Sequence, residues 1–159
     1  MIKIVLGLTL TTVMLSAWFP NISFGGSGDE RYERKDKSFV RDAKQEVVQD
    51  TKNSKMYSDG KTSNRMHFYA AWEYCQTMNH AGHNDWRVPS KDELRTLLEL
   101  SRRSVTVKHA FKNVIEEKYW SSTEDRYSTK SWYFDFDLGR YSTDRNSKMY
   151  RTMCVRDSK

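Results

Sequence analysis

The chain contains only two cysteines, Cys75 and Cys154, which stand 79 positions apart. Two cysteines are too few for a disulfide-dense scaffold or for a four-cysteine zinc site. If they bond to each other, the bond closes a long loop and holds the middle of the chain to its C-terminal end. The alternative is a pair of reduced thiols inside the core. The choice between the two depends on the compartment in which the protein folds.

The N-terminus has the features of an export signal. Lys3 is followed by an uncharged, mostly apolar segment over residues 4–19, which is too short for an ordinary membrane span but typical of a secretory signal. We expect cleavage after Ala17 or Gly25, with an uncleaved N-terminal anchor as the alternative. In either case the rest of the chain is expected in the periplasm, at the cell surface or outside the cell. Cysteines pair in these oxidising compartments, so export favours the disulfide.

The predicted organisation has three parts. Residues 1–25 are the signal peptide, residues 26–37 are a flexible polar linker rich in glycine and charge, and residues 38–159 are a single domain. We expect no stable membrane span once the signal peptide is removed.

The middle of the chain has a helical period. Apolar side chains over residues 66–79 recur at the spacing of one helix face, which predicts a first helix. Ser90 and Glu93 then form the S-x-x-E pattern of a capping box. This pattern predicts a second helix over residues 90–101, with leucines on one face.

The two ends of the chain have a strand pattern. Short apolar segments predict strands near residues 39–40, 47–48, 56–57, 119–123, 131–137 and 149–156. Within 131–137 we expect Trp132, Phe134 and Phe136 on one face of the strand and Tyr133, Asp135 and Asp137 on the other. Strands, two helices and further strands in this order predict an α+β class with an antiparallel sheet.

Four motifs occur in order along the chain. They are an A-x3-C helix ending at Cys75, the step WRVPSKDEL at 86–94, the strand YWSST at 119–123 and the terminal CVR at 154–156. Together they resemble the Lcl C-terminal domain family of bacterial exported proteins, over about residues 39–156. The resemblance implies a C-type-lectin-like fold, in which two helices pack on antiparallel sheets and the family's cysteine pair is bonded. Residues 51–57 depart from the family's T-G-L-x-W turn and strand.

The step around Pro89 also resembles formylglycine-generating enzymes, whose chemistry needs a pair of catalytic cysteines. Here Cys154 is the only late cysteine, and its expected partner is structural. We therefore expect no enzyme activity and no cofactor. The motif residues are interpreted as structural: Trp86, Arg87, Pro89, Ser90, Glu93 and Trp120.

No metal site is expected. The two prolines, Pro20 and Pro89, do not stand in the triplets that calcium-dependent lectins use, and Asp135 and Asp137 suit a strand face better than a calcium loop. His80 and His83 lack a third ligand at a suitable spacing for zinc.

Basic residues are the remaining functional signal. The chain has 27 lysines and arginines against 21 acidic residues, a net charge of +6. An exported basic protein meets acidic polysaccharides or surface proteins rather than nucleic acid. The candidate ligand-binding residues combine cations with tyrosines in the last third of the chain: Arg140, Tyr141, Arg145, Lys148, Tyr150 and Arg151. An ordinary solvated surface is the alternative interpretation.

The functional hypothesis is therefore an exported, non-catalytic module that recognises an acidic glycan or another surface polymer. A structural partner module of a surface assembly is the first alternative. An enzyme related to formylglycine-generating enzymes is the second.

Overall fold

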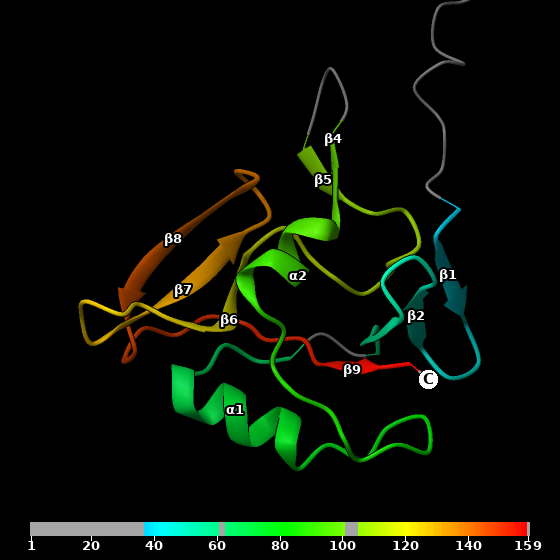
Figure 1. Ribbon diagram of the computed structural model, residues 1–159, viewed down its shortest axis with the longest axis horizontal. Coiled ribbons are helices and arrows are strands. Elements are labelled where there is room, and N and C mark those ends of the chain that lie inside the picture. The colour runs from blue at the N-terminus through cyan, green and yellow to red at the C-terminus, as the bar shows by residue number, and fades with distance from the viewer. Residues whose placement is uncertain (1–36, 61–62, 101–104, 159) are drawn as a thin grey trace, which may run out of the picture.

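Short antiparallel hairpins supply most of the regular structure (Figure 1). The computed structural model describes residues 37–60, 63–100 and 105–158. The elements in chain order are β1 (Phe39–Asp42), β2 (Val47–Asp50), β3 (Lys55–Ser58), α1 (Phe68–Gln76), α2 (Lys91–Thr96), β4 (Leu98–Leu100), β5 (Val105–Val107), β6 (Lys118–Glu124), β7 (Lys130–Asp135), β8 (Arg140–Arg145) and β9 (Val155–Asp157). This confirms the predicted α+β class.

The first sheet has the order β1-β2-β3-β9 and joins the two ends of the domain. Its hairpin turns follow from aspartates that accept hydrogen bonds from backbone N–H groups two and three residues later. Asp42 does this between β1 and β2, and Asp50 does it between β2 and β3. The C-terminal strand β9 then pairs antiparallel with β3, placing Val155 opposite Tyr57.

The second large sheet has the order β6-β7-β8 and lies on the opposite side of the molecule from β1 and β2, with α2 between them (Figure 1). The turn from β7 to β8 is stabilised by Asp135, whose carboxylate accepts the N–H of Leu138 at 3.2 Å. Gly139 follows with a positive φ of 61°, which glycine adopts without a steric penalty.

Two apolar clusters form the core. The first lies between α2, the first sheet and the β6–β8 sheet, and includes Leu94, Tyr57 and Phe134. The second surrounds α1 and includes Phe68 and Trp120. Fully burying side chains of this kind contributes about 1.5–3 kcal/mol each.

The predicted strict alternation in β7 is wrong in part. Phe134 and Phe136 are buried and Asp137 is exposed, as the pattern predicts. Asp135 is also buried, and Tyr133 packs against the second cluster. Both faces of β7 are therefore covered, because α2 packs on one face and Tyr150, whose ring lies 4.8 Å from that of Tyr133, on the other.

Both helices are shorter than predicted. The first helix begins at Phe68, where the ring of His67 accepts the N–H of Ala70, and it ends at Gln76. The capping box of Ser90 and Glu93 is present, but α2 ends at Thr96 rather than near residue 101. The chain leaves the helix at Leu97 because the following residues pair with β5 instead. Arg102 and Arg103, whose positive charges favour a helix C-terminus, lie outside the described residues.

The last third of the chain also differs from the prediction. Strand β8, over 140–145, was not predicted, because its sequence RYSTDR has no apolar alternation. The single strand predicted over 149–156 is wrong. Instead, Tyr150 and Arg151 form isolated bridges to Met66 and Tyr119, and regular pairing resumes only at β9.

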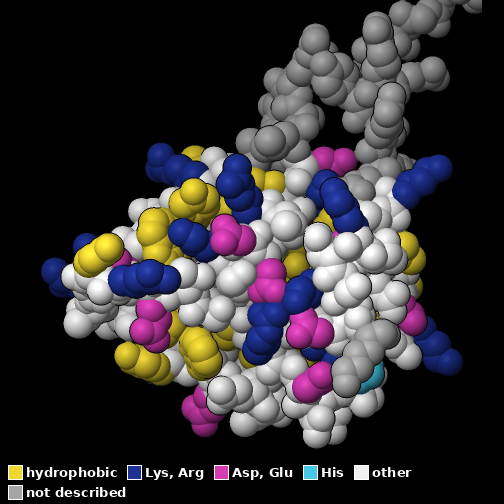
Figure 2. All heavy atoms as spheres, viewed as in Figure 1, with side chains coloured by type: hydrophobic (Ala, Val, Ile, Leu, Met, Phe, Trp, Pro, Cys, Tyr) yellow, Lys and Arg dark blue, Asp and Glu magenta, His cyan; other side chains and the backbone are white. Residues whose placement is uncertain are grey.

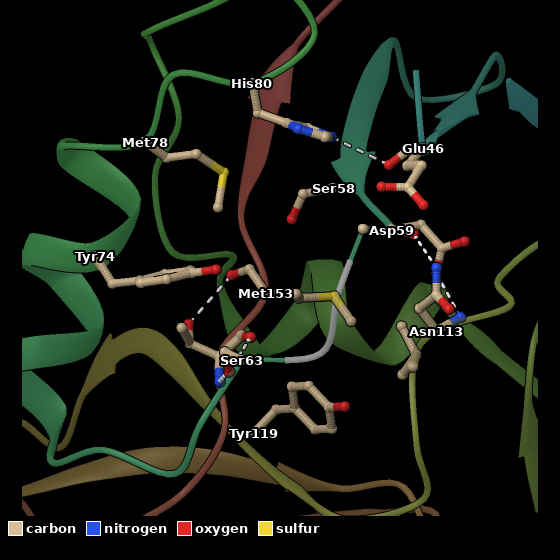
Figure 3. Close-up of a pocket in the computed structure, with 13 residues that line it drawn as sticks. Glu46, Ser58, Asp59, Ser63, Tyr74, Met78, His80, Asn113, Tyr119 and Met153 are labelled. Carbon is tan, nitrogen blue, oxygen red and sulfur yellow. Dashed lines mark hydrogen bonds between the residues drawn. The ribbon is translucent and has the colours of Figure 1, made fainter. Parts of the chain in front are cut away.

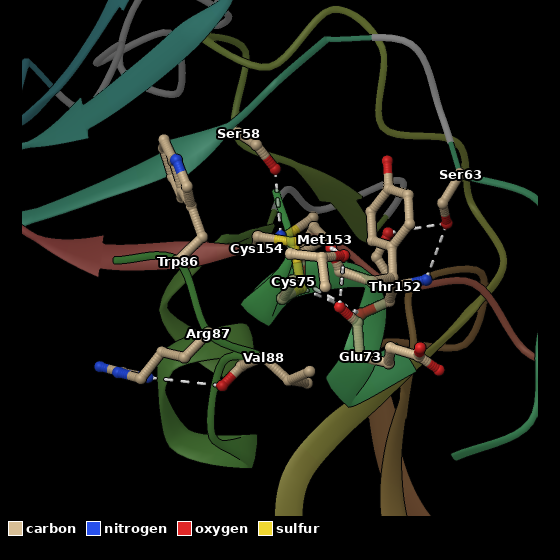
Figure 4. The surroundings of a disulfide bond; sticks show 12 residues. Ser58, Ser63, Glu73, Cys75, Trp86, Arg87, Val88, Thr152, Met153 and Cys154 are labelled. Atoms are coloured by element: carbon tan, nitrogen blue, oxygen red, sulfur yellow. Dashed lines mark hydrogen bonds between the residues drawn. A yellow bond between two sulfur atoms is a disulfide. The ribbon is translucent and has the colours of Figure 1, made fainter. Parts of the chain in front are cut away.

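Cys75 and Cys154 form a disulfide, as predicted, with a Cα–Cα distance of 5.5 Å (Figure 4). Cys75 comes from the last turn of α1 and Cys154 from the segment just before β9. Both cysteines are fully buried. The bond therefore fastens the helix to the C-terminal segment inside the second cluster.

We predict that replacing both cysteines with alanine lowers the free energy of unfolding by about 2–5 kcal/mol, because the closed loop no longer restricts the unfolded chain. Urea denaturation with and without a reducing agent measures this. The wild type should lose stability on reduction, whereas the double variant should not respond. Equal stability of the two proteins under oxidising conditions would contradict the prediction.

Candidate functional site

A network of polar residues fixes the loop before α2. Both terminal nitrogens of Arg87 donate to the carboxylate of Glu93, at 2.8 and 2.7 Å. The same carboxylate accepts the N–H of Ser90 at 2.8 Å, and the hydroxyl of Ser90 accepts the N–H of Glu93 at 3.2 Å. Arg87 is also bonded through its backbone to Val155 in β9. The network thus connects the start of α2 to the C-terminal strand.

Glu93 is stabilised in its charged form by this network. Partial burial alone would raise the pKa of its carboxyl group. The hydrogen bonds from Arg87 and Ser90, with the charges of Arg87 and Lys55, outweigh burial and lower that pKa from 4.5 to about 2. The hydrogen bonds that the Glu93 carboxylate accepts all come from the loop before α2, which fits a structural role.

The lowered pKa makes Glu93 contribute to stability above pH 4.5, and this contribution is lost as the pH falls towards 2. Glu93→Gln should therefore reduce the free energy of unfolding at pH 7 by up to about 3 kcal/mol, and by about half as much at pH 3. Urea denaturation at both pH values measures the difference. The control variant Glu116→Gln, at an exposed glutamate outside this network, should have little effect at either pH. A pH-independent effect of Glu93→Gln would contradict the predicted cause.

The six candidate ligand-binding residues do not form one cluster. Strands β7 and β8 pair Phe134 with Tyr141 and Asp135 with Arg140. Directly opposed residues of an antiparallel pair lie on the same face. Tyr141 and Arg145 consequently share the face that carries Phe134, whereas Arg140 lies on the opposite face. Lys148 is exposed in the turn that follows β8.

Arg151 is engaged within the domain. Its guanidinium forms an ion pair with Glu117 at 2.8 Å and donates to the carbonyl of Ser63, and only 19% of the side chain is exposed. Hydrogen bonds from Arg65 and Arg151 lower the pKa of Glu117 to about 2. Arg151 thus anchors the C-terminal segment and has little capacity left for a ligand.

Tyr150 is engaged in the same way. Its hydroxyl donates to Asp144 at 2.6 Å. Its ring lies 4.7 Å from the ring of Trp120 and 4.8 Å from that of Tyr133, measured between centroids. Burial and the neighbouring Asp144 raise the pKa of Tyr150. The ring is therefore a packing element rather than an exposed stacking surface.

A different set of residues combines cations with aromatic rings. The Nζ atom of Lys91 lies 4.4 Å from the ring centroid of Trp132 and 5.4 Å from that of Tyr141. The two rings meet edge to face at 5.4 Å. Lys130 and Arg145 oppose each other at the end of the same β7–β8 face. We call Lys91, Lys130, Trp132, Tyr141 and Arg145 the cation–aromatic face.

The fold positions this face through local contacts. Lys91 is the first residue of α2, and its N–H donates to the hydroxyl of Thr123 in β6 at 3.2 Å. This bond holds the helix start over the sheet. Figure 2 shows Lys and Arg side chains beside hydrophobic ones over the β6–β8 sheet, on the left of the molecule. Tyr141 is 40% exposed, so its ring is accessible to a ligand.

Lys91 and Lys130 could not be predicted from the sequence as members of this face. Lys91 lies far from β8 along the chain, and only the packing of α2 on the sheet brings it there. The position of Lys130 opposite Arg145 depends on strand β8, which has no clear sequence signal. Trp132 was placed correctly on the face of Phe134, but its contact with Lys91 is a tertiary feature.

No group of three or more metal-ligating side chains occurs within residues 37–60, 63–100 and 105–158. His80 and His83 are joined by two backbone hydrogen bonds that close a tight turn. The indole of Trp86 donates to both of their carbonyls, at 3.3 and 3.1 Å. These histidines therefore shape a loop beside α1.

Two comparisons bear on identity. A family model described as the Lcl C-terminal domain matches residues 38–156. This match confirms the resemblance that the motifs predict. A search of curated proteins gave no match.

Proposed function

Since the chain belongs to the Lcl C-terminal domain family, we propose that it is an exported, non-catalytic binding domain of a surface protein. We propose further that it recognises an acidic glycan through the cation–aromatic face. The C-type-lectin-like arrangement implied by the family resemblance is part of this proposal. The family assignment supports a surface domain, and the geometry of the face supports the ligand class.

The observation that carries the proposal is the position of Lys91 above Trp132 and Tyr141. The apolar side of a sugar ring can pack on an aromatic face, and a carboxylate or sulfate on that ring can pair with an ammonium. A glycan with both features would match this surface. Because the lysine is already held over the rings, less conformational entropy is lost on binding.

The overall chemistry of the chain supports export and an anionic ligand. The net charge of +6 favours association with a polyanion. The disulfide is typical of an oxidising compartment. Among the residues that the structure describes, no helix is long and apolar enough to cross a membrane.

A non-catalytic role is supported by the state of the cysteines. Both cysteines of the chain are used in the disulfide, so neither is free as a thiol. The polar groups of Arg87 and Glu93 are engaged with each other in the loop before α2. The chemistry of formylglycine-generating enzymes therefore has no counterpart among these residues.

Charge reversal tests the proposed face. Lys91→Glu and Arg145→Glu should each weaken binding to a heparin-like polyanion by about tenfold at low salt, because attraction between opposite charges is replaced by repulsion. Lys44→Glu, an equal charge change in the turn between β1 and β2, is the matched control and should have a much smaller effect. Calorimetric titration at about 50 mM and about 500 mM salt measures the affinities, and wild-type binding should fall steeply at the higher salt. Equal loss in all three variants would show attraction to net charge and contradict a defined face.

The aromatic part of the face is tested separately. Tyr141→Ala should weaken binding about three- to tenfold at both salt concentrations, because the lost contact is not a charge pair. Thermal unfolding of the variant confirms that the sheet is intact. If the loss vanished at high salt, the tyrosine would not be packing on the ligand.

A further inference from the structure

A cavity of about 190 Å³ lies between the C-terminal half of α1, the end of β3 and the segments around residues 113–119 and 152–153 (Figure 3). It is separate from the cation–aromatic face, because none of its lining residues belongs to that face. The volume equals that of about six water molecules in the liquid. The space suits one sugar ring or a short chain rather than a polymer.

One part of the cavity wall is apolar. Met78 and Met153 point their thioethers into the space, and Tyr119 lies below them (Figure 3). Val114 adds a branched side chain. Flexible methionine side chains adapt to the outline of a ligand. This wall would accept the carbon skeleton of a small molecule.

Three polar side chains face the same space: Glu46, Ser58 and Tyr74. The hydroxyl of Ser58 accepts the N–H of Cys154 at 3.0 Å, which leaves its own hydrogen available to donate. Within the described parts of the chain, the Glu46 carboxylate and the Tyr74 hydroxyl have no hydrogen-bond or ion-pair partner. Tyr74 is 37% exposed and lies where a ligand can reach it.

The second carboxylate of the cavity wall is already neutralised. Asp59 is paired with Arg41 at 3.1 Å and accepts backbone N–H groups of Lys112 and Asn113. Burial and the nearby charge of Glu46 raise the pKa of Asp59, against the lowering effect of these partners. Among the described residues, the carboxylate of Glu46 is therefore the charge in the cavity wall that has no ion-pair partner.

Gly60 and His80 lie next to this charge. A Cβ atom at position 60 would stand 3.4 Å from Oε2 of Glu46 and 3.7 Å from Cε1 of His80. The ring of His80 is held by the backbone, because its Nε2 lies 3.2 Å from the carbonyl oxygen of Glu46. The carboxylate and the imidazole thus form one rim of the cavity, opposite Tyr74 (Figure 3).

We propose that this cavity binds a small hydroxylated primary amine, an amino sugar or an amino alcohol. The ammonium group would pair with Glu46, the hydroxyl groups would bond with Ser58 and Tyr74, and the carbon skeleton would pack on the two methionines. An ammonium has three hydrogens to donate and a carboxylate accepts them well. This site goes beyond the proposed polyanion-binding function, because it would bind a positively charged ligand at another place on the domain.

Glucosamine is the probe for this site, and glucose and N-acetylglucosamine are the uncharged comparisons. Carbon-13 methyl NMR of the full protein should show saturable shifts of the Met78 and Met153 methyl signals with glucosamine. The signal of Met149, which is exposed outside the cavity, should not move. The affinity for each uncharged sugar should be lower than that for glucosamine by at least about tenfold, because a charge-assisted hydrogen bond is lost.

Three variants complete the test. Glu46→Gln should weaken glucosamine binding about tenfold and Tyr74→Phe about threefold. Glu73→Gln, the same charge change on an exposed neighbour in α1, should leave it unchanged. Thermal unfolding verifies that each variant is folded. Absence of Met78 and Met153 shifts, equal affinity for glucose, or unchanged binding by Glu46→Gln would each overturn the proposal, and none of these results would affect the polyanion face.

Discussion

The disulfide between Cys75 and Cys154 holds the C-terminal segment against α1, and the rest of the domain is bonded to that segment. The carbonyl of Cys154 accepts the N–H of Ser58 at the end of β3, and Val155 exchanges two backbone hydrogen bonds with Arg87. A few residues earlier, Arg151 bonds through its backbone to Lys118 and Trp120. One short segment thus connects the first sheet, the loop before α2 and the β6–β8 sheet.

This connection explains how a domain with small sheets can present a defined surface. Trp120 is fully buried, and its indole N–H donates to the carbonyl of Met66 at 2.9 Å. These contacts hold β6 against the second cluster. The capping box then fixes the start of α2 over β6 and β7. Backbone and core contacts therefore fix the position from which the Lys91 side chain reaches over Trp132. Such preorganisation is what distinguishes a binding face from a scattered set of surface charges.

The features that the sequence predicts well are local ones. The capping box, the apolar face of α1 and the family motifs depend on residues close together in the chain, and the Lcl C-terminal domain assignment follows from them. The end of α2 and the formation of β8 depend on pairing between separate segments of the chain. The sequence of β8 has no alternation of apolar residues from which a strand could be predicted. For the same reason the six predicted residues do not lie together in the structure. Arg151 pairs with Glu117, and Tyr150 donates a hydrogen bond to Asp144. The cation next to the ring of Tyr141 is Lys91, which comes from α2.

If the cation–aromatic face contacts the glycan, the indole of Trp132 is the most direct reporter of that contact. Nitrogen-15 labelling of tryptophan allows each indole N–H signal to be followed during titration with a heparin-like oligosaccharide. The account predicts a saturable shift of the Trp132 signal, with little change at Trp86 and Trp120, whose indoles are bonded inside the domain. Binding that leaves the Trp132 signal unmoved, or that shifts Trp86 or Trp120 instead, would contradict it.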